Sequence, residues 1–189
     1  MPTTALIVHA TTHGHTGRVA QRIADVMRAA GADVTAIELP KRGDPPGGPP
    51  SPTGYDVVVA AGSLHAGKHQ RQLVRWIRAH APSLAAVPSA LVSVSLTAAE
   101  DSEEARTATR ACVDELIDET SWTPDRVLYV AGALQYREYD VATRVLMRLI
   151  ARRHGQSTDA HEDVEYTDWA AVDAFAQELA AGVARGSAA

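Results

Sequence analysis

Residues 7–23 contain a pattern of residue types that can bind a phosphate group. An apolar stretch runs into a loop of threonine, histidine and glycine, and a helical pattern follows the loop directly. The first N–H groups of a helix lack intrahelical acceptors, and the helix dipole adds about half a positive charge at that end. Hydroxyls can donate further hydrogen bonds, and a glycine lets the backbone approach an anion closely. We therefore expect a phosphate to be bound by Thr11, Thr12, His13, Gly14, His15 and Thr16.

The spacing of these residues distinguishes the loop from two other phosphate-binding motifs. A P-loop requires a lysine directly after its second glycine, yet no lysine lies between Gly14 and Lys41. A dinucleotide fingerprint requires three spaced glycines, and only Gly14 and Gly17 are present. A strand–loop–helix turn without a ligand is the simpler alternative. The remaining spacing resembles the FMN-phosphate signature of the flavodoxin family, although His9 stands where that family usually has Phe or Tyr. The matching positions are Thr11-x-x-Gly14-x-Thr16-x-x-x-Ala20-x-x-Ile23.

The composition of the whole chain narrows the class of protein. A length of 189 residues favours a single domain over residues 1–189, and a net charge of −5 argues against nucleic-acid binding. Cys112 is the only cysteine, so no disulfide can form within the chain and a reducing, cytoplasmic location is expected. We expect neither a secretion signal nor a membrane span, because the N-terminus lacks a basic segment and no apolar run approaches about 18 residues.

The hydropathy pattern predicts alternating strands and helices that must position the phosphate loop. Strands are expected at residues 5–10, 33–39, 55–61, 89–96 and 127–134, and helices at 17–30, after residue 69, at 103–119 and at 168–184. Such alternation implies right-handed crossovers, so we predict a flavodoxin-like α/β fold with a doubly wound, five-stranded parallel sheet in the order 2-1-3-4-5. Residues 40–54, rich in proline and glycine, should form an extended loop instead of a helix.

This strand order brings three loops together, because ligands bind beyond the carboxyl ends of strands 1, 3 and 4. The phosphate loop follows strand 1. We expect the other two loops to hold a flavin ring, and Lys68 could neutralise the reduced ring. Their residues are Ser63, Leu64, His65, Ala66, Gly67 and Lys68 after strand 3, and Ser95, Leu96, Thr97 and Ala98 after strand 4.

Four histidines lie on two of these loops. They are His13, His15, His65 and His69, and four imidazoles at one edge could ligate a metal. No cysteine or carboxylate completes a standard ligand set with useful spacing, so no metal is expected. We expect one or two of these histidines to donate hydrogen bonds to phosphate or flavin, with tighter phosphate binding below about pH 6.5.

A helical insert is predicted before the last helix, over residues 137–164. Residues 140–154 have an apolar side, while Arg144, Arg148 and Arg152 recur on the other side. A surface helix with a solvated basic face is one interpretation. The alternative is a lid or a peripheral membrane-surface helix that attracts anionic groups.

Motifs throughout the chain resemble those of one branch of the flavodoxin superfamily, the menaquinone-dependent protoporphyrinogen dehydrogenases. The resemblance implies an FMN enzyme that oxidises a porphyrinogen and passes electrons to a quinone at a membrane. It associates the insert with activity, and we expect substrate contacts from Tyr136, Arg144 and Arg148. The motifs are Gly67-x-His69, Pro88-Ser89-Ala90, Ser93-Val94-Ser95-Leu96, Ser121-Trp122-x-Pro124-Asp125-Arg126, Ala131-Gly132-Ala133-Leu134-x-Tyr136 and Glu165-Tyr166-Thr167-Asp168-Trp169.

Other functions stay open at this point. Leu64-His65-Ala66 stands where the family tends to present Arg and Tyr near the flavin, so His65 would have to replace an aromatic ring. The alternatives are an FMN electron carrier without a small-molecule substrate, and a binding module of the same fold that has lost FMN. A nicotinamide-binding domain ranks lower, with Glu38 placed as a ribose carboxylate. A homo-oligomer with contacts from Trp76 and the insert is also an open possibility.

Overall fold

The sheet has the predicted order. The computed structural model describes residues 2–134 and 164–186. Its parallel strands run β2-β1-β3-β5-β6, which is the expected order 2-1-3-4-5. The strands are β1 (Thr4–Ala10), β2 (Asp33–Glu38), β3 (Val57–His65), β5 (Ser89–Ser95) and β6 (Arg126–Ala131). All seven residues of β5 are buried, as expected for a strand covered on both faces.

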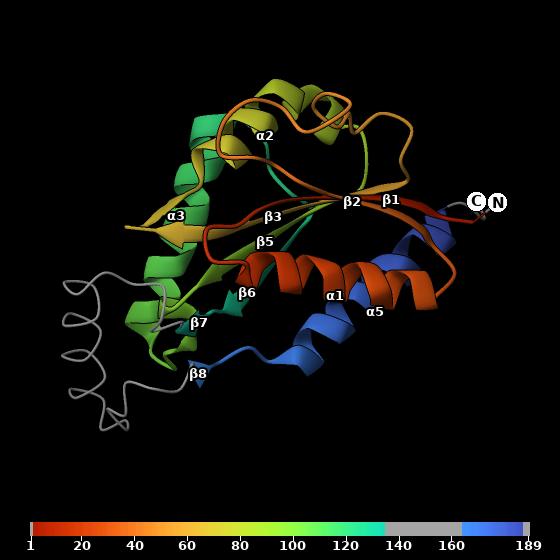
Figure 1. Cartoon of the computed structure of the whole chain (residues 1–189). Coiled ribbons are helices and arrows are strands. Elements are labelled where there is room, and N and C mark those ends of the chain that lie inside the picture. Colours follow the sequence, from red (N-terminus) through yellow and green to blue (C-terminus); the bar gives the residue numbers. More distant parts are fainter. Residues whose placement is uncertain (1, 135–163, 187–189) are drawn as a thin grey trace.

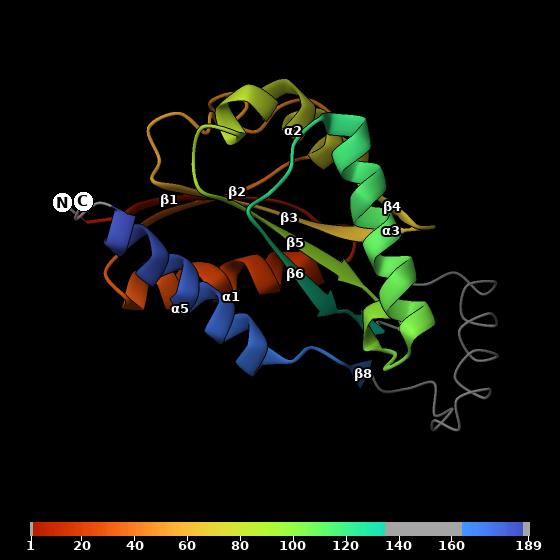
Figure 2. The same ribbon diagram turned by 180° about the vertical axis from the view of Figure 1, so that it is seen from behind.

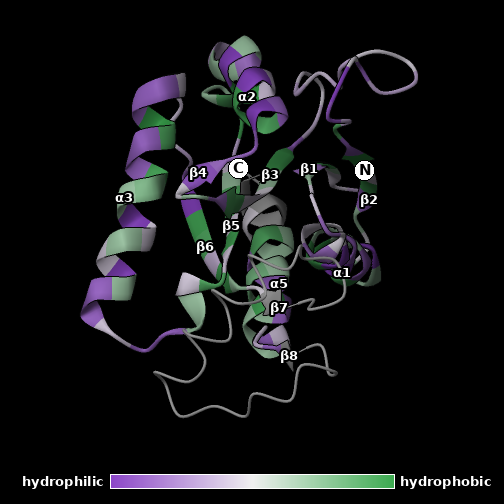
Figure 3. Ribbon diagram, turned by 60° about the vertical axis from the view of Figure 1, so that its left-hand side comes forward, coloured by the Kyte–Doolittle hydropathy of each residue, from purple (hydrophilic) through white to green (hydrophobic). Residues whose placement is uncertain are grey.

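Helices cover both faces of the sheet (Figures 1 and 2). Helices α1 (His15–Ala29) and α5 (Trp169–Gly186) lie on one face, and α2 (Arg71–Leu84) and α3 (Glu103–Thr120) lie on the other. Figure 3 shows hydrophobic strands between helices that alternate hydrophobic and hydrophilic residues. One apolar cluster joins Ile7, Ile23 and Phe175, and a second joins Leu73 and Trp122. These two apolar clusters pack the helices onto the sheet, whose strands have their carboxyl ends at one edge.

The segment after strand 3 differs from the prediction. We expected strand 3 to end at residue 61 and residues 62–69 to form a loop. Instead β3 continues to His65 and pairs antiparallel with β4 (Lys68–His69), so that the segment is a β-hairpin. Ala66 and Gly67 form its turn with positive φ angles of 49° and 79°. A two-residue turn of this kind matches the twist of paired strands.

Other boundaries shifted as well. Helix α1 begins at His15, two residues before the expected 17, and α5 extends to Gly186. The predicted strand 127–134 is interrupted at Gly132, and β7 (Ala133–Leu134) pairs instead with β8 (Val164–Glu165). The expected helix 140–154 and the substrate residues Tyr136, Arg144 and Arg148 lie outside the described residues.

The proline-rich segment 40–54 contains neither helix nor strand, as its composition predicts. It packs against α2, where the Trp76 Nε1–H donates to the Pro50 carbonyl at 2.8 Å. Trp76 is 4% exposed, so it is not available for the oligomer contact that the sequence suggested.

Gly62 pairs with both β1 and β5, two residues before the hairpin begins at Leu64, and has no room for a side chain. A Cβ there would lie 2.5 Å from the Leu73 Cδ2 and 3.0 Å from the Gln70 Oε1, and Leu73 is fully buried. Overpacking of this kind costs about 1–3 kcal/mol. We expect Gly62→Ala to lower the free energy of unfolding by about that amount in urea titrations. The control is Gly182→Ala in α5, where nothing lies within 4 Å of the added Cβ; an equal loss there would contradict the prediction.

Candidate functional site

The phosphate loop ends in an uncapped helix. Gly14, the N-cap of α1, has a φ of 81° and makes no side-chain cap hydrogen bond, and nothing lies within 4 Å of a Cβ built on it. No acidic residue occupies the first turn of α1. The positive end of the helix dipole therefore faces an open loop without a compensating carboxylate on that turn. This arrangement suits an anion, as the sequence predicted.

His15 connects this loop to the segment that follows the insert. Its Nε2 lies 2.8 Å from the Thr167 Oγ1, and that hydroxyl donates to the Ala131 carbonyl at 2.8 Å. A hydroxyl has one hydrogen, so the His15 Nε2 must carry the proton that it shares with Thr167. Burial lowers the pKa of His15, so the ring is neutral and its buried Nδ1 has no hydrogen-bond partner among the described residues. The His15 side chain thus bonds the C-terminal segment, which leaves its backbone N–H for the expected phosphate.

The neighbouring contacts strengthen this connection. Arg18 pairs with Glu165 at 3.1 Å, and its guanidinium lies 5.5 Å from the centre of the Trp169 ring. Because β7 pairs with β8, the segments directly before and after residues 135–163 lie side by side, next to α1. The motif at residues 165–169 therefore supports the start of α1, a role that its sequence did not indicate.

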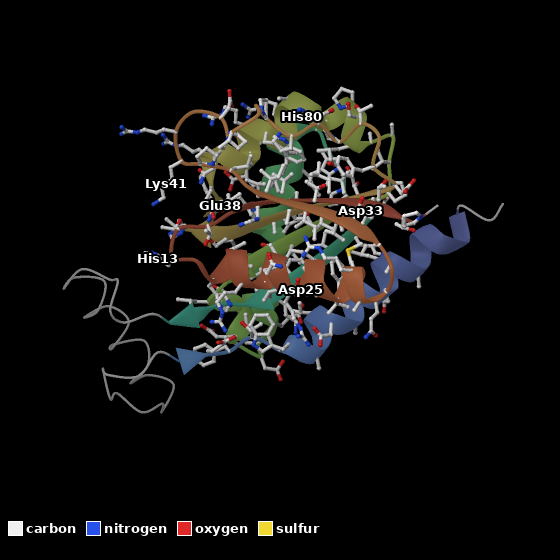
Figure 4. All side chains as sticks on the ribbon, turned by 45° about the vertical axis from the view of Figure 1, so that its right-hand side comes forward. His13, Asp25, Asp33, Glu38, Lys41 and His80 are labelled. Atoms are coloured by element: carbon white, nitrogen blue, oxygen red, sulfur yellow. The ribbon has the colours of Figure 1, made fainter. Side chains whose placement is uncertain are left out.

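The hairpin brings a third histidine, His65, to the phosphate loop, which itself contains His13 and His15. The ring centres of His13 and His65 lie 6.0 Å apart with the planes tilted by 53°. The ring of His65 is only partly covered, and this partial burial, and then the charges of His13 and Lys41, lower its pKa, so the ring is neutral at pH 7. Figure 4 places His13, Glu38 and Lys41 at the same edge of the sheet, with Asp33 at the opposite end. The phosphate loop and the segment after strand 3, two of the three loops expected at the flavin site, therefore lie close together.

The hairpin is held by side chains beneath it. Gln70 accepts from the Ser63 N–H at 2.9 Å and its amide donates to the Ser63 hydroxyl. The buried His69 Nε2 lies 3.1 Å from the Ser93 Oγ. Lys68 pairs with Glu115 of α3 at 2.7 Å and therefore faces that helix. Gln70 was not predicted as a site residue, because a single glutamine carries no recognisable motif.

The third loop forms a compact turn beside β6. The Ser95 hydroxyl accepts from the Ala98 N–H at 3.1 Å, and the Gly132 N–H donates to the Ser95 carbonyl at 2.9 Å. A 3-10 turn (Thr97–Ala99) follows Leu96, as β5 ends at Ser95. The loop thus follows the carboxyl end of β5, where the strand order places it.

His9 fills the position that is usually aromatic in the flavodoxin signature. Its Nε2 lies 3.7 Å from Glu38 and would lie 3.4 Å from a Cβ on Gly17. Burial lowers its pKa despite the nearby Glu38 charge. The imidazole therefore packs as a flat neutral ring against α1, with the Glu38 carboxylate nearby.

In residues 2–134 and 164–186, no group of three or more His, Cys, Asp or Glu side chains is arranged to hold a metal ion. Within the same ranges no helix is long and apolar enough to cross a membrane.

These features fit FMN. The uncapped α1 and the open Gly14 can take its phosphate, and the hairpin and the Ser95–Ala98 turn follow the strands at whose ends a ring would lie. His65 supplies the exposed flat ring on the hairpin. The individual cofactor contacts expected from residues 11–16, 63–68 and 95–98 all stay predictions.

Comparisons with known proteins agree with this arrangement. The flavodoxin domain family matches residues 6–161. The protoporphyrinogen IX dehydrogenase (quinone) of Escherichia coli K12 is 32% identical over 177 residues, covering 93% of both chains. That of Leishmania major is 32% identical over 93% of this chain and 74% of its own. A Streptococcus pneumoniae flavodoxin structure matches with a TM-score of 0.53 at 19% identity, covering 95% of this chain and 99% of that one, which shows the shared fold. The chain therefore belongs to the flavodoxin family and, within it, to the family of the protoporphyrinogen IX dehydrogenases (quinone).

Proposed function

We propose that this protein is an FMN-dependent oxidoreductase that oxidises a porphyrinogen and passes the electrons to a quinone. The observation that carries the proposal is the 32% identity to the Escherichia coli protoporphyrinogen IX dehydrogenase (quinone) over 93% of both chains. The uncapped phosphate loop beside the His65 hairpin supports it, because these features suit the cofactor that such a reaction needs.

When bound, FMN supplies the group that accepts electrons from one substrate and donates them to another. The protein's part is to bind and orient it. The start of α1 would hold the phosphate, and the neutral His65 ring would present a flat uncharged surface to the flavin. Gln70 holds Ser63, at the base of the hairpin, through two hydrogen bonds and so helps to position the hairpin beside the ring. No side chain is assigned as an acid or base.

The substrate contacts at Tyr136, Arg144 and Arg148 belong to the same proposal. So do a cytoplasmic location, a peripheral membrane contact through residues 140–154 and assembly into a homo-oligomer. Each can be tested separately once turnover has been measured.

The test is anaerobic turnover of a porphyrinogen by protein reconstituted with FMN, followed by the fluorescence of the porphyrin product. We expect product to form only when a quinone is added. Bound FMN without turnover of any porphyrinogen would contradict the proposal and favour an electron carrier. Failure to retain FMN, seen as a colourless protein after dialysis, would favour a binding module that has lost its cofactor.

A further inference from the structure

A cavity beside the expected flavin site, with His65 and Lys68 in its lining, lies between α2, α3 and the β3–β4 hairpin. Its volume is about 690 Å³, within the range of small-molecule sites. Val74, Leu116 and Cys112 form an apolar part of its lining. Figure 3 shows β4 between the two helices, and the hairpin residues His65, Lys68 and His69 belong to the lining of the cavity.

The groove has an excess of positive charge. Two ion pairs bridge it, Lys68 with Glu115 and Arg78 with Glu119, each at 2.7 Å. Arg71 and Arg75 also line it, one turn apart on α2, and neither has an acidic partner in the part of the chain that the structure describes. The two acids of the lining are thus already paired, and two arginines remain to bind an anion.

The N-terminus of α2 adds to this charge. Its N-cap, Gln70, makes no side-chain cap hydrogen bond, since its amide is bonded to Ser63. The first turn contains no acidic residue and begins with Arg71. A cation at the positive end of a helix is unfavourable, so an anion bound there would relieve the repulsion.

The groove also reaches the flavin hairpin. His65 lines it and lies 6.0 Å, between ring centres, from His13 of the phosphate loop. A ligand in the groove would therefore contact the same hairpin that borders the expected flavin. The cavity thus combines an apolar lining with two unpaired arginines, and it lies next to the flavin hairpin. These features suit a ligand with a bulky apolar body and two carboxylates.

We propose that the groove binds the carboxylate-bearing edge of the substrate, with Arg71 and Arg75 as its carboxylate partners. The proposal rests on the proposed function, because protoporphyrinogen IX, which the names of the relatives give as their substrate, carries two propionate groups on a large apolar ring system. Arginine matches carboxylates through paired, charge-assisted hydrogen bonds. The groove thereby selects for tetrapyrroles whose carboxylates are free.

The test is a spectroscopic titration of the FMN-loaded protein with protoporphyrin IX and with its dimethyl ester. We expect Arg71→Gln/Arg75→Gln to raise the Kd for protoporphyrin IX by at least about tenfold, because the variant loses hydrogen bonds between charged groups. The Kd for the dimethyl ester should not change. The matched control is Arg28→Gln/Arg126→Gln. It removes the same charge at the end of α1 and the start of β6, away from the groove.

The outcomes separate this proposal from the function itself. Equal Kd values for wild type and the groove variant, an equal loss in the control variant or an equal loss for the ester would each overturn the groove assignment, even if porphyrinogen turnover is found. An arginine-dependent Kd without turnover would support the groove and contradict the proposed function. FMN absorbance, expected to be equal in all variants, shows that the flavin site is intact.

Discussion

Thr12→Asp is expected to raise the Kd for FMN by at least about 100-fold while leaving the apoprotein at least as stable as the wild type. Residue 12 lies in the loop that leads into the uncapped α1. A carboxylate there would face the FMN phosphate, and two unit charges about 4 Å apart repel by about 4 kcal/mol at an effective dielectric constant of about 20. The same carboxylate lies at the positive end of a helix, where it favours folding. Affinity and stability should therefore change independently.

The comparison that isolates the charge is Thr12→Asn, which has nearly the same size as aspartate and no charge. We expect its Kd for FMN, measured by fluorescence quenching of the flavin, to rise by less than about tenfold, since one neutral hydrogen bond contributes about 1 kcal/mol. Melting temperatures of both apoproteins serve as the stability measurement. If Thr12→Asp bound FMN as tightly as Thr12→Asn, the phosphate would not lie in this loop.

The fold could be predicted from the sequence where the signal is local. Strand β5 is an apolar run covered on both faces, and alternation with helices then implied the parallel order. The hairpin could not be predicted, since β4 has two residues and its turn places the non-glycine Ala66 at positive φ. Pairing of β7 with β8 was also missed, because two-residue strands separated by about 30 residues have no periodicity.

The candidate site, like the fold, could be predicted only in part. The predicted strand order was enough to place the phosphate loop next to the segment that contains His65. The structure places the centres of the His13 and His65 rings 6.0 Å apart. The partners of individual side chains were not predictable. His15 meets Thr167 across 152 positions, and Lys68 meets Glu115 across 47. Such pairs depend on helix packing over the sheet, which hydropathy patterns do not specify. The sequence therefore predicted which loops meet at this edge of the sheet, and tertiary packing determined which side chains there have protein partners.

Acid is expected to destabilise the protein through His69. This histidine is 6% exposed and burial lowers its pKa from 6.5 to about 4, although Glu115 opposes the shift. Between these values the unfolded chain binds a proton that the folded protein does not, so stability falls as the pH falls from 6.5 toward 4. A pKa shift of that size corresponds to about 3 kcal/mol of stability. This stability is fully present above pH 6.5 and fully lost below pH 4.

The measurement is urea unfolding of wild type and His69→Gln from pH 4 to pH 7. Glutamine keeps a hydrogen-bonding group near Ser93 and cannot be protonated, so the difference between the two proteins isolates His69 from the other titrating groups. We expect wild type to lose about 3 kcal/mol more than the variant on acidification. NMR titration of the wild-type imidazole gives the folded-state pKa directly. Parallel stability curves with a pKa near 6.5 would show that His69 is hydrated, and that the hairpin beside the flavin site is looser than the structure shows.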